Sequence, residues 1–382
     1  MSADSGAFYR RERKVGRNMT LRRIVQAMLG LVAVFLLGKV VSAQLSRSDV
    51  RSLYTVVELG TLRVDCVSYG NRINAAGNVV GRSGYLNGTD TRAVLWTRTG
   101  EIESLGVLPG GDYSAAYAIS ESGQVVGISN TPTAVHAFRW TSAAQMQDLG
   151  TLPDDTGSQA FALNRGGKVV GTSSGPGGTR AVLWKNDGQI QDLGTLDGGD
   201  YSEAVAINDP GQVVGTSGSS SGPRAFLWTE QSGMQDLGTL PGDTGSEAVD
   251  INNAGQVVGQ SSGPNGTHAF LWTSDGGMQD LGTLPGGEDS RALGINNAGL
   301  IVGTSGSASG TRAFLWKRNV GLQDLNSLIP PLDNLGSVLS EAHAVGELGE
   351  IVALIGGGEE APMAGDDTHE EDHFYRAFLL TP

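Results

Sequence analysis

The chain has 382 residues and a formal net charge of −14 at pH 7, from 26 Lys and Arg against 40 Asp and Glu. This balance argues against nucleic acid or an anionic lipid surface as a partner, because both repel an acidic protein. The single cysteine, Cys66, excludes a disulfide within the chain. The 58 glycines fit a chain with many turns.

The first 43 residues have the composition and order of a secretion signal. Seven Arg and Lys side chains lie between positions 10 and 23, an uncharged and mostly apolar run covers residues 24–38, and Val41-Ser42-Ala43 fits a cleavage site. We therefore expect a secreted chain, extracellular or periplasmic, that begins at Gln44 and has a short linker over residues 44–53. The first 43 residues hold eight basic and two acidic side chains, so the remaining chain has a net charge of −20.

The alternative is an uncleaved N-terminal segment that anchors the chain in the inner membrane. A membrane-spanning helix needs about 20 apolar residues, whereas this run has 15. If the segment is retained, we expect membrane contact only through it.

An internal repeat fills the rest of the chain, residues 54–382. The six tryptophans are all the tryptophans of the protein, and they follow one another at intervals of 44 residues: Trp96, Trp140, Trp184, Trp228, Trp272 and Trp316. A constant period of this length, occupied by strands and turns, is typical of a β-propeller blade.

Each unit contains four short apolar runs, as residues 246–284 illustrate. The runs cover residues 248–252, 256–259, 268–273 and 278–281, and turn sequences rich in Asn, Asp and Gly separate them. Such lengths indicate strands rather than helices. In the third run both alternating sets of side chains are largely apolar, which suits a sheet packed between two neighbouring sheets.

The aligned repeats predict an all-β fold with seven blades of four antiparallel strands, closed into a ring. Seven copies of the third run occur, but the last one, residues 376–379, has no fourth run after it. The missing copy stands at the other end of the chain, at residues 54–60. We therefore predict that an N-terminal strand completes the last blade, with Glu58 beside Arg376. An open solenoid is the alternative, and it leaves the divided unit unexplained.

A cation opens each third run, and an acidic residue lies 12 positions later in most fourth runs. The two side chains can face each other across a hairpin, where an opposite-charge pair contributes roughly 0.2–1 kcal/mol. The predicted structural pairs, besides Glu58 with Arg376, are Arg180 with Asp192, Arg224 with Asp236, and Arg312 with Asp324. A ring of cations that binds a partner is the functional alternative, which the neighbouring carboxylates oppose.

Two sets of loops, those between blades and those between second and third strands, are expected on one face of the propeller. They are rich in carboxylates, hydroxyls and backbone amides, and two of them carry tyrosines that offer stacking surfaces. Such a rim suits a polar ligand such as a glycan, although the acidic residues lack the order of a calcium-binding loop. Turn residues selected for backbone geometry are the structural alternative. The candidate ligand-binding residues are Asp112, Tyr113, Asp200, Tyr201, Asp243, Glu288 and Asp289.

The last blade carries an acidic insertion at residues 357–375. It contains an H-E-x-x-H sequence, which on a helix places two imidazoles around zinc. Its surroundings are acidic, lack an apolar stripe and supply no third ligand downstream, so a protease is not expected. We expect no cofactor, and interpret the segment as a solvated acidic loop or as an adventitious site for a divalent metal. The metal candidates are Asp366, Asp367, His369, Glu370 and His373.

The repeated sequences resemble those of a known family. Residues 267–272 read T-H-A-F-L-W and residues 279–285 read Q-D-L-G-T-L-P, with I-N-x-x-G-x-V-V-G before them. In these motifs the chain is similar to the HAF-repeat family of bacterial extracellular proteins, over about residues 54–382. The resemblance implies an exported bacterial repeat protein. It supplies no reaction, because the family is defined by its repeat.

These observations favour an exported, non-catalytic binding or scaffold module. It would present a polar loop face to a glycan, an envelope component or a protein. Two alternatives remain: a glycan-active surface enzyme that uses the mouth of the central channel, and a structural surface protein. Nothing in the sequence shows a cluster of acid and base residues confined to one or two blades, apart from the acidic insertion.

Overall fold

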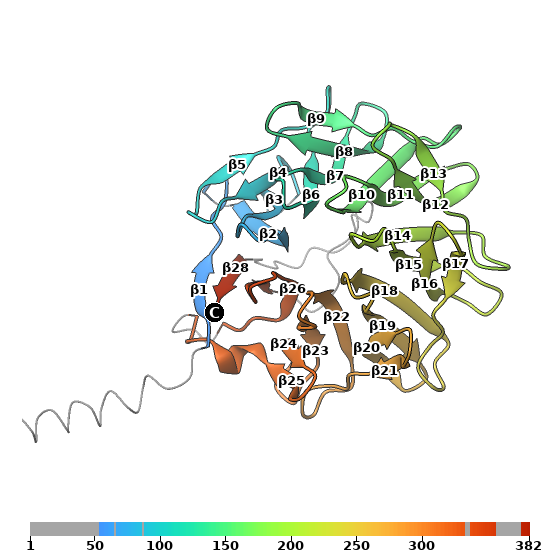
Figure 1. Ribbon diagram of the computed structural model, residues 1–382. Helices are drawn as coiled ribbons and strands as arrows, with labels where there is room; N and C mark the ends of the chain where they lie inside the picture. Colours follow the sequence, from blue (N-terminus) through green and yellow to red (C-terminus); the bar gives the residue numbers. More distant parts are fainter. Residues whose placement is uncertain (1–52, 65, 86–87, 333–336, 357–375) are drawn as a thin grey trace, which may run out of the picture. The chain divides into compact units, whose positions relative to one another are not determined.

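The computed structural model describes residues 53–382 except 65, 86–87, 333–336 and 357–375. Seven four-stranded antiparallel sheets form a ring, which confirms the predicted seven-bladed β-propeller (Figure 1). The predicted signal at residues 1–43 and most of the 44–53 linker lie outside the described residues. In the described part of the chain, no helix is long and apolar enough to cross a membrane.

Blades 1 to 3 follow the predicted order of four consecutive strands. Blade 1 contains β2 (Cys66–Ile73), β3 (Val79–Tyr85), β4 (Arg92–Trp96) and β5 (Ile102–Ser104). Blade 2 contains β6 (Ser114–Ile119), β7 (Val125–Asn130), β8 (Val135–Thr141) and β9 (Gln145–Asp148). Blade 3 contains β10 (Gly157–Leu163), β11 (Val169–Gly175), β12 (Gly178–Trp184) and β13 (Ile190–Asp192).

Blades 4 to 6 repeat the same plan. Blade 4 contains β14 (Ser202–Ile207), β15 (Val213–Ser217), β16 (Arg224–Thr229) and β17 (Gly233–Asp236). Blade 5 contains β18 (Gly245–Ile251), β19 (Val257–Gly263), β20 (Gly266–Thr273) and β21 (Gly277–Asp280). Blade 6 contains β22 (Ser290–Ile295), β23 (Ile301–Ser305), β24 (Arg312–Lys317) and β25 (Gly321–Asp324), followed by the short 3-10 helix η1 (Leu325–Leu328).

The closing blade is assembled from both ends of the described chain. It contains β26 (Glu341–Val345), β27 (Ile351–Ile355) and β28 (Arg376–Thr381), and β1 (Thr55–Glu58) is its fourth strand. β1 pairs antiparallel with β28, in the order β1-β28-β27-β26. The predicted closure by an N-terminal strand is therefore present.

The first two strands of blade 5 are longer than the sequence predicted. β18 and β19 continue their ladder up to the pair Gly245 and Ser262, beyond the apolar positions that mark the strands in the sequence. β18 also contains a bulge, because its register shifts between Ala248 and Asp250. A bulge at this place occurs in the first strand of every blade, and it leaves one side chain per blade outside the ladder.

Apolar side chains fill the spaces between blades. In the junction of blades 5 and 6, for example, Leu271 packs with Ile295 and Trp316. Buried serines join the same neighbours through hydrogen bonds: Ser290 Oγ accepts from the Ala269 backbone N–H at 2.9 Å and donates to the Gly282 carbonyl at 2.7 Å. The Ala269 amide would otherwise be buried without a partner, a cost of about 1–3 kcal/mol. This explains why the repeat holds a serine there.

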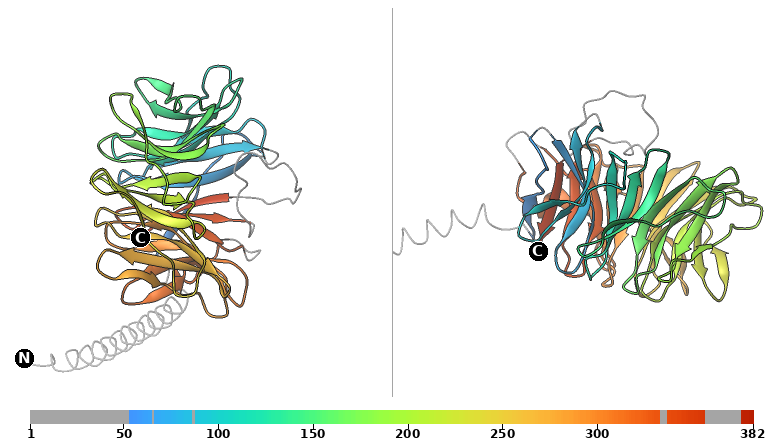
Figure 2. Two further views of the ribbon diagram at one scale, coloured as in Figure 1. Left: turned by 90° about the vertical axis from the view of Figure 1, so that its right-hand side faces the viewer. Right: turned by 90° about the horizontal axis from the view of Figure 1, so that it is seen from above.

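The two faces of the ring differ. The face that carries the loops between blades and the loops between second and third strands is called the loop face. The opposite face carries the hairpins between first and second strands and between third and fourth strands, and is called the hairpin face. Side views show the sheets standing on edge between the two (Figure 2). On the hairpin face, asparagine side chains link the blades in series, as when Asn208 Nδ2 donates to the Asn252 carbonyl at 3.0 Å.

Candidate binding site at the centre of the loop face

The predicted rim carboxylates lie in the loops of the loop face, where several of them stabilise loop structure. Asp112 accepts a hydrogen bond of 2.5 Å from Asn130 Nδ2, and Asp243 accepts one of 2.7 Å from Ser261 Oγ. Asp289 accepts from the Thr267 backbone N–H at 2.8 Å. These contacts tie each carboxylate to a strand residue of the same blade or of the preceding blade, so they favour the structural interpretation for these three residues.

The other two acidic candidates contribute backbone atoms to blade junctions. The Asp200 carbonyl accepts a hydrogen bond from Arg180 Nη1 at 2.5 Å, and the Glu288 carbonyl accepts from His268 Nε2 at 3.2 Å. In both cases the cation at the start of a third strand reaches the loop that leads into the next blade. These cations therefore join neighbouring blades, a role that the sequence did not indicate.

The predicted cross-strand ion pairs form in some blades only. Arg376 donates to Glu58 through Nε at 2.7 Å and through Nη2 at 2.6 Å, although 318 positions separate the two residues. Arg224 lies 3.8 Å from Asp236. In the described part of the chain, neither Arg180 with Asp192 nor Arg312 with Asp324 forms an ion pair.

The fourth-strand carboxylates have a different main partner. Asp192 Oδ1 accepts from the Gly194 backbone N–H at 2.8 Å, and Asp324 Oδ1 accepts from the Asn326 backbone N–H at 2.9 Å. An aspartate that binds the amide two residues on forms a local turn. This turn ends the fourth strand.

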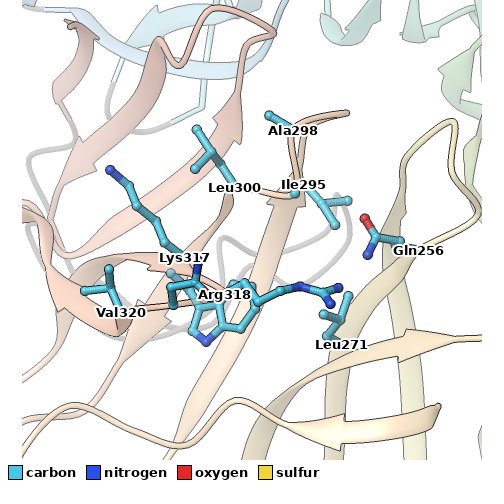
Figure 3. A pocket seen from close by; sticks show the side chains of 11 residues that line it. Gln256, Leu271, Ile295, Ala298, Leu300, Lys317, Arg318 and Val320 are labelled. Atoms are coloured by element: carbon cyan, nitrogen blue, oxygen red, sulfur yellow. The ribbon is translucent and has the colours of Figure 1, made fainter.

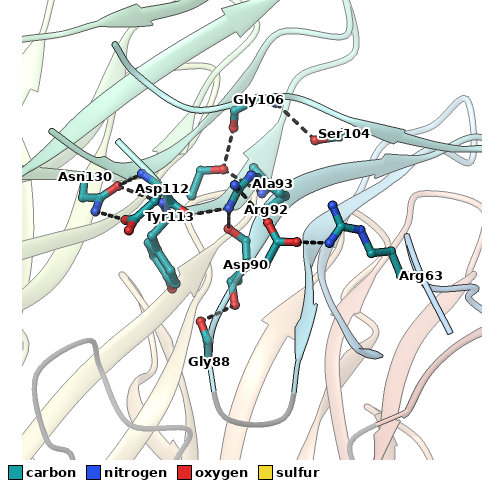
Figure 4. A network of polar contacts seen from close by, with 12 residues as sticks. Arg63, Gly88, Asp90, Arg92, Ala93, Ser104, Gly106, Asp112, Tyr113 and Asn130 are labelled. Carbon is teal, nitrogen blue, oxygen red and sulfur yellow. Dashed lines mark hydrogen bonds and ion pairs between the residues drawn. The ribbon is translucent and has the colours of Figure 1, made fainter. Parts of the chain in front are cut away.

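Blade 1 shows the most connected of these junctions (Figure 4). Arg92 lies 3.0 Å from Asp90 and also donates to the Asp112 carbonyl, while Asp90 forms a second ion pair with Arg63. The network joins the loop after β3 to the start of blade 2. It consists of ion pairs satisfied within the fold, so we assign it a structural role.

An aromatic and cationic group lies on the inner strands of blades 1 and 2. The guanidinium of Arg82 stacks 4.3 Å from the ring centroid of Tyr69, and its Nη1 donates to Tyr113 Oη at 3.5 Å. Burial, followed by the nearby Tyr113, raises the pKa of Tyr117 to about 12. Tyr117 in turn contacts Phe161 of blade 3, with ring centroids 5.6 Å apart. Tyr113 is therefore a rim candidate that the structure places in a larger cluster, here called the tyrosine–arginine group: Tyr69, Arg82, Tyr113 and Tyr117.

A second group, of opposite charge, lies on blades 4 and 5. Burial raises the pKa of Glu203, and the neighbouring Glu247 raises it further. Burial also raises the pKa of Tyr201, to which the same two carboxylates contribute. Glu247 accepts a hydrogen bond of 2.7 Å from Gln260 Nε2. The rim candidate Tyr201 thus lies beside a pair of carboxylates, and these three residues are here called the carboxylate group.

The two groups occupy equivalent positions of the repeat. The first strands contact one another around the inside of the ring (Figure 1). At one position of these strands every blade but one carries a large polar or charged residue: Tyr69, Ala115, Gln159, Glu203, Glu247, Arg291 and Glu341. The residue before it is always serine and the residue after it is always Ala or Gly. A comparison of the repeats at this position could have found Tyr69, Glu203 and Glu247 from the sequence.

An ion pair across the ring centre was not predicted at all. Arg72 on β2 donates two hydrogen bonds to Asp250 on β18, at 2.8 and 2.9 Å. Asp250 is 5% exposed and also accepts from the Ile295 backbone N–H at 3.1 Å. Blades 1 and 5 are not neighbours, so the two side chains must meet near the axis. At the corresponding positions blades 2, 3 and 4 carry Ala118, Ala162 and Ala206.

The predicted metal candidates Asp366, Asp367, His369, Glu370 and His373 lie outside the described residues. Within the part of the chain that the structure describes, no group of three or more His, Cys, Asp or Glu side chains is placed to hold a metal ion.

Comparisons with solved structures find the same fold at low sequence identity. An oligogalacturonate lyase from Vibrio parahaemolyticus is 12% identical, with a TM-score of 0.55 over 87% of this chain and 94% of that chain. An oligogalacturonate lyase in complex with manganese is 10% identical, with a TM-score of 0.54 over 87% and 94%. A streptogramin B lyase is 13% identical, with a TM-score of 0.53 over 86% and 97%. This likeness shows the β-propeller fold alone. No family model and no curated protein matches the sequence.

Proposed function

We propose that this protein is an exported, non-catalytic binding module that takes a glycan or another polar cell-envelope ligand at the centre of its loop face. The observation that carries the proposal is the distribution of differences between repeats. The serine before the inner-strand position and the Ala or Gly after it recur in every blade, whereas the position between them changes from blade to blade. The recurring residues are those that a scaffold needs to hold its blades together. The variable position is what the recognition of a ligand needs.

The chemistry of the two groups suits a polar ligand that offers hydroxyl groups and flat apolar faces. The tyrosines supply stacking surfaces with a polar end, and Arg82 supplies donors fixed by its contact with Tyr69. Glu203 and Glu247 supply acceptors on the other side of the ring. We propose no binding of nucleic acid, because the chain has a formal charge of −14.

The binding experiment uses variants that restore the residues found in other blades. Arg82→Thr places at this position the residue of Thr172, and Glu203→Gln places the residue of Gln159. We expect both changes to weaken binding on a glycan array about tenfold, since each removes a charge-assisted hydrogen bond of about 1.5–3 kcal/mol. Arg98→Gln, on the hairpin face, is the control and should bind as the parent does. Unchanged binding in both test variants, or no binding of the parent, would favour a structural surface protein instead.

A second function, a surface enzyme acting on glycans, is favoured by one observation. A carboxylate with a raised pKa next to a second carboxylate is typical of acid–base sites, and Glu203, whose pKa burial and the neighbouring Glu247 raise, fits that description. Release of reducing ends from a polysaccharide, lost in Glu203→Gln with binding retained, would replace the binding module by the enzyme.

Export is part of the proposal. It is supported by the signal-like order of residues 1–43 and by the resemblance to the HAF-repeat family. N-terminal sequencing of the product recovered outside the cytoplasm should begin at Gln44. An intact N-terminus in the membrane fraction would show an anchored chain.

A further inference from the structure

A cavity of about 370 Å³ opens on the hairpin face between blades 5 and 6. Leu271 and Gln256 of blade 5 line one side, and Ile295, Leu300 and Trp316 of blade 6 line the other (Figure 3). The hairpin between β24 and β25 completes the wall with Lys317, Arg318 and Val320. This size is within the range of small-molecule pockets, which is about 300–1,000 Å³.

The cavity combines apolar and cationic walls and lacks an acidic one. Arg318 extends toward Leu271 and Gln256, while Lys317 lies on the other side of Leu300 (Figure 3). Among the described residues, neither cation has a side-chain hydrogen bond or an ion pair. Two such cations beside an apolar wall are unusual on a chain with a net charge of −14, and they favour an anion over a neutral or positive ligand.

The residues that form this wall are departures from the repeat. At the position of Leu300 the other blades carry only polar residues: Asn78, Gln124, Lys168, Gln212, Gln256 and Glu350. At the position of Arg318, blades 2 to 5 carry Ser142, Asn186, Glu230 and Ser274, and only blade 1 has another arginine, Arg98. The propeller does not need Leu300 or Arg318 for its architecture, because the other blades fold without this combination.

We propose that this cavity binds a small amphipathic anion, with the apolar body against Leu271, Leu300 and Ile295 and the anionic group on Arg318. The site lies on the face opposite the tyrosine–arginine and carboxylate groups, so it is independent of the function proposed above. Its ligand class is a carboxylate or sulfonate attached to a ring system or a short alkyl chain.

The test uses two fluorescent probes on the purified full chain. Anilinonaphthalene sulfonate has the proposed chemistry, and phenylnaphthylamine is its analogue without the sulfonate. We expect saturable binding of the sulfonate. Arg318→Gln should weaken it about fivefold, as one partly exposed charge contact predicts, and should leave the uncharged probe unchanged. Leu300→Gln, which restores the residue of other blades, should weaken both probes.

Arg98→Gln is the matched control, because Arg98 occupies the same hairpin position in blade 1. It should change neither probe. The proposal is wrong if the parent shows no saturable sulfonate binding, if Arg318→Gln binds the sulfonate as the parent does, or if Arg98→Gln causes the same loss. Arg318 is exposed, so we expect Arg318→Gln to fold as the parent does. The test therefore remains decisive even if Leu300→Gln unfolds.

Discussion

Blade 5 and the closing blade solve the same packing problem with different chain connections. In blade 5 a tight hairpin joins the third and fourth strands, and Phe270 pairs with Asp280. In the closing blade no hairpin joins the third strand, β28, to the fourth strand, β1. Phe378 nevertheless pairs with Glu58 in the same register. The turn therefore does not set the register. It follows from the alternation of buried and exposed side chains, because a slip by one residue would turn the apolar set outward.

The closing blade replaces the missing hairpin by side-chain contacts. Tyr54 and Leu59, which flank β1, are each 6% exposed. The Leu53 backbone N–H donates to the Leu328 carbonyl at 2.7 Å, and Thr55 Oγ1 lies 2.5 Å from Thr381 Oγ1. Arg376 and Glu58 add a bidentate ion pair. Each contact is noncovalent, so the ring remains closed only while β1 stays bound.

Removal of β1 should have the largest effect. Deletion of residues 53–60 removes Tyr54 and Leu59 from the core and exposes the edge of β28. Losing one large buried side chain costs about 2–5 kcal/mol, so the total approaches the whole stability of a domain. We expect loss of cooperative thermal unfolding by circular dichroism. Deletion of residues 44–52 is the control and should be nearly neutral, and a shortened chain that melts like the parent would disprove closure by β1.

Loss of the ion pair between blades 1 and 5 should have the second largest effect on stability, because this pair is a second link across the ring. Asp250→Ala leaves the half-buried Arg72 without its partner, which costs less than the about 3–5 kcal/mol of breaking a fully buried pair but more than an exposed one. The double variant Arg72→Ala with Asp250→Ala restores the alanines of other blades and should recover most of this loss. Urea unfolding measures both. Equal destabilisation in the single and double variants would show that the charge pair itself is unimportant.

A glycine distinguishes the two blades further. A Cβ at Gly259 would lie 2.0 Å from the Glu247 carbonyl oxygen, whereas the closing blade has Ala353 at the same position of its ladder. We expect Gly259→Ala to lower the free energy of unfolding by about 1–3 kcal/mol through overpacking. Ala353→Gly should cost no more than about 1 kcal/mol. An equal loss of unfolding free energy in the two variants would mean that the first and second strands are equally close together in blade 5 and in the closing blade.

The exposed ion pair of the closing blade should contribute little. The side chains of Arg376 and Glu58 are 42% and 47% exposed, so Glu58→Gln should lower stability by less than about 1 kcal/mol. The loss should shrink in high salt, which screens the pair. A larger loss that salt does not change would mean that Glu58 holds β1 through contacts other than charge.

In blade 5 the corresponding pair is His268 with Asp280, and the stability that this pair contributes should depend on pH. His268 Nδ1 lies 2.9 Å from Asp280, and this hydrogen bond is the main cause that raises the pKa of His268 above 6.5. The stabilisation is therefore complete below the unfolded pKa of 6.5 and is lost as the pH rises through the folded value. Compared with the parent, His268→Arg should show a smaller fall in melting temperature above pH 6.5. Identical pH profiles would rule out this contribution.

The architecture of the propeller could be predicted from the amino-acid sequence. The 44-residue period, the four apolar runs and the divided unit are local or countable features, and each follows from strand alternation and turn chemistry. Even the contact between Glu58 and Arg376 could be predicted. The last repeat lacks its fourth strand, an extra strand stands at the N-terminal end, and the repeats share one register.

The side-chain contacts between blades could not be predicted from the repeat and become visible in the folded ring. Arg180 reaches the Asp200 carbonyl of the loop into the next blade, which spacing along one hairpin did not reveal. Arg72 meets Asp250 because a ring brings the first strands of distant blades to one axis. Such contacts depend on the curvature of the ring and on the direction of each side chain, and no periodic pattern in the sequence encodes either.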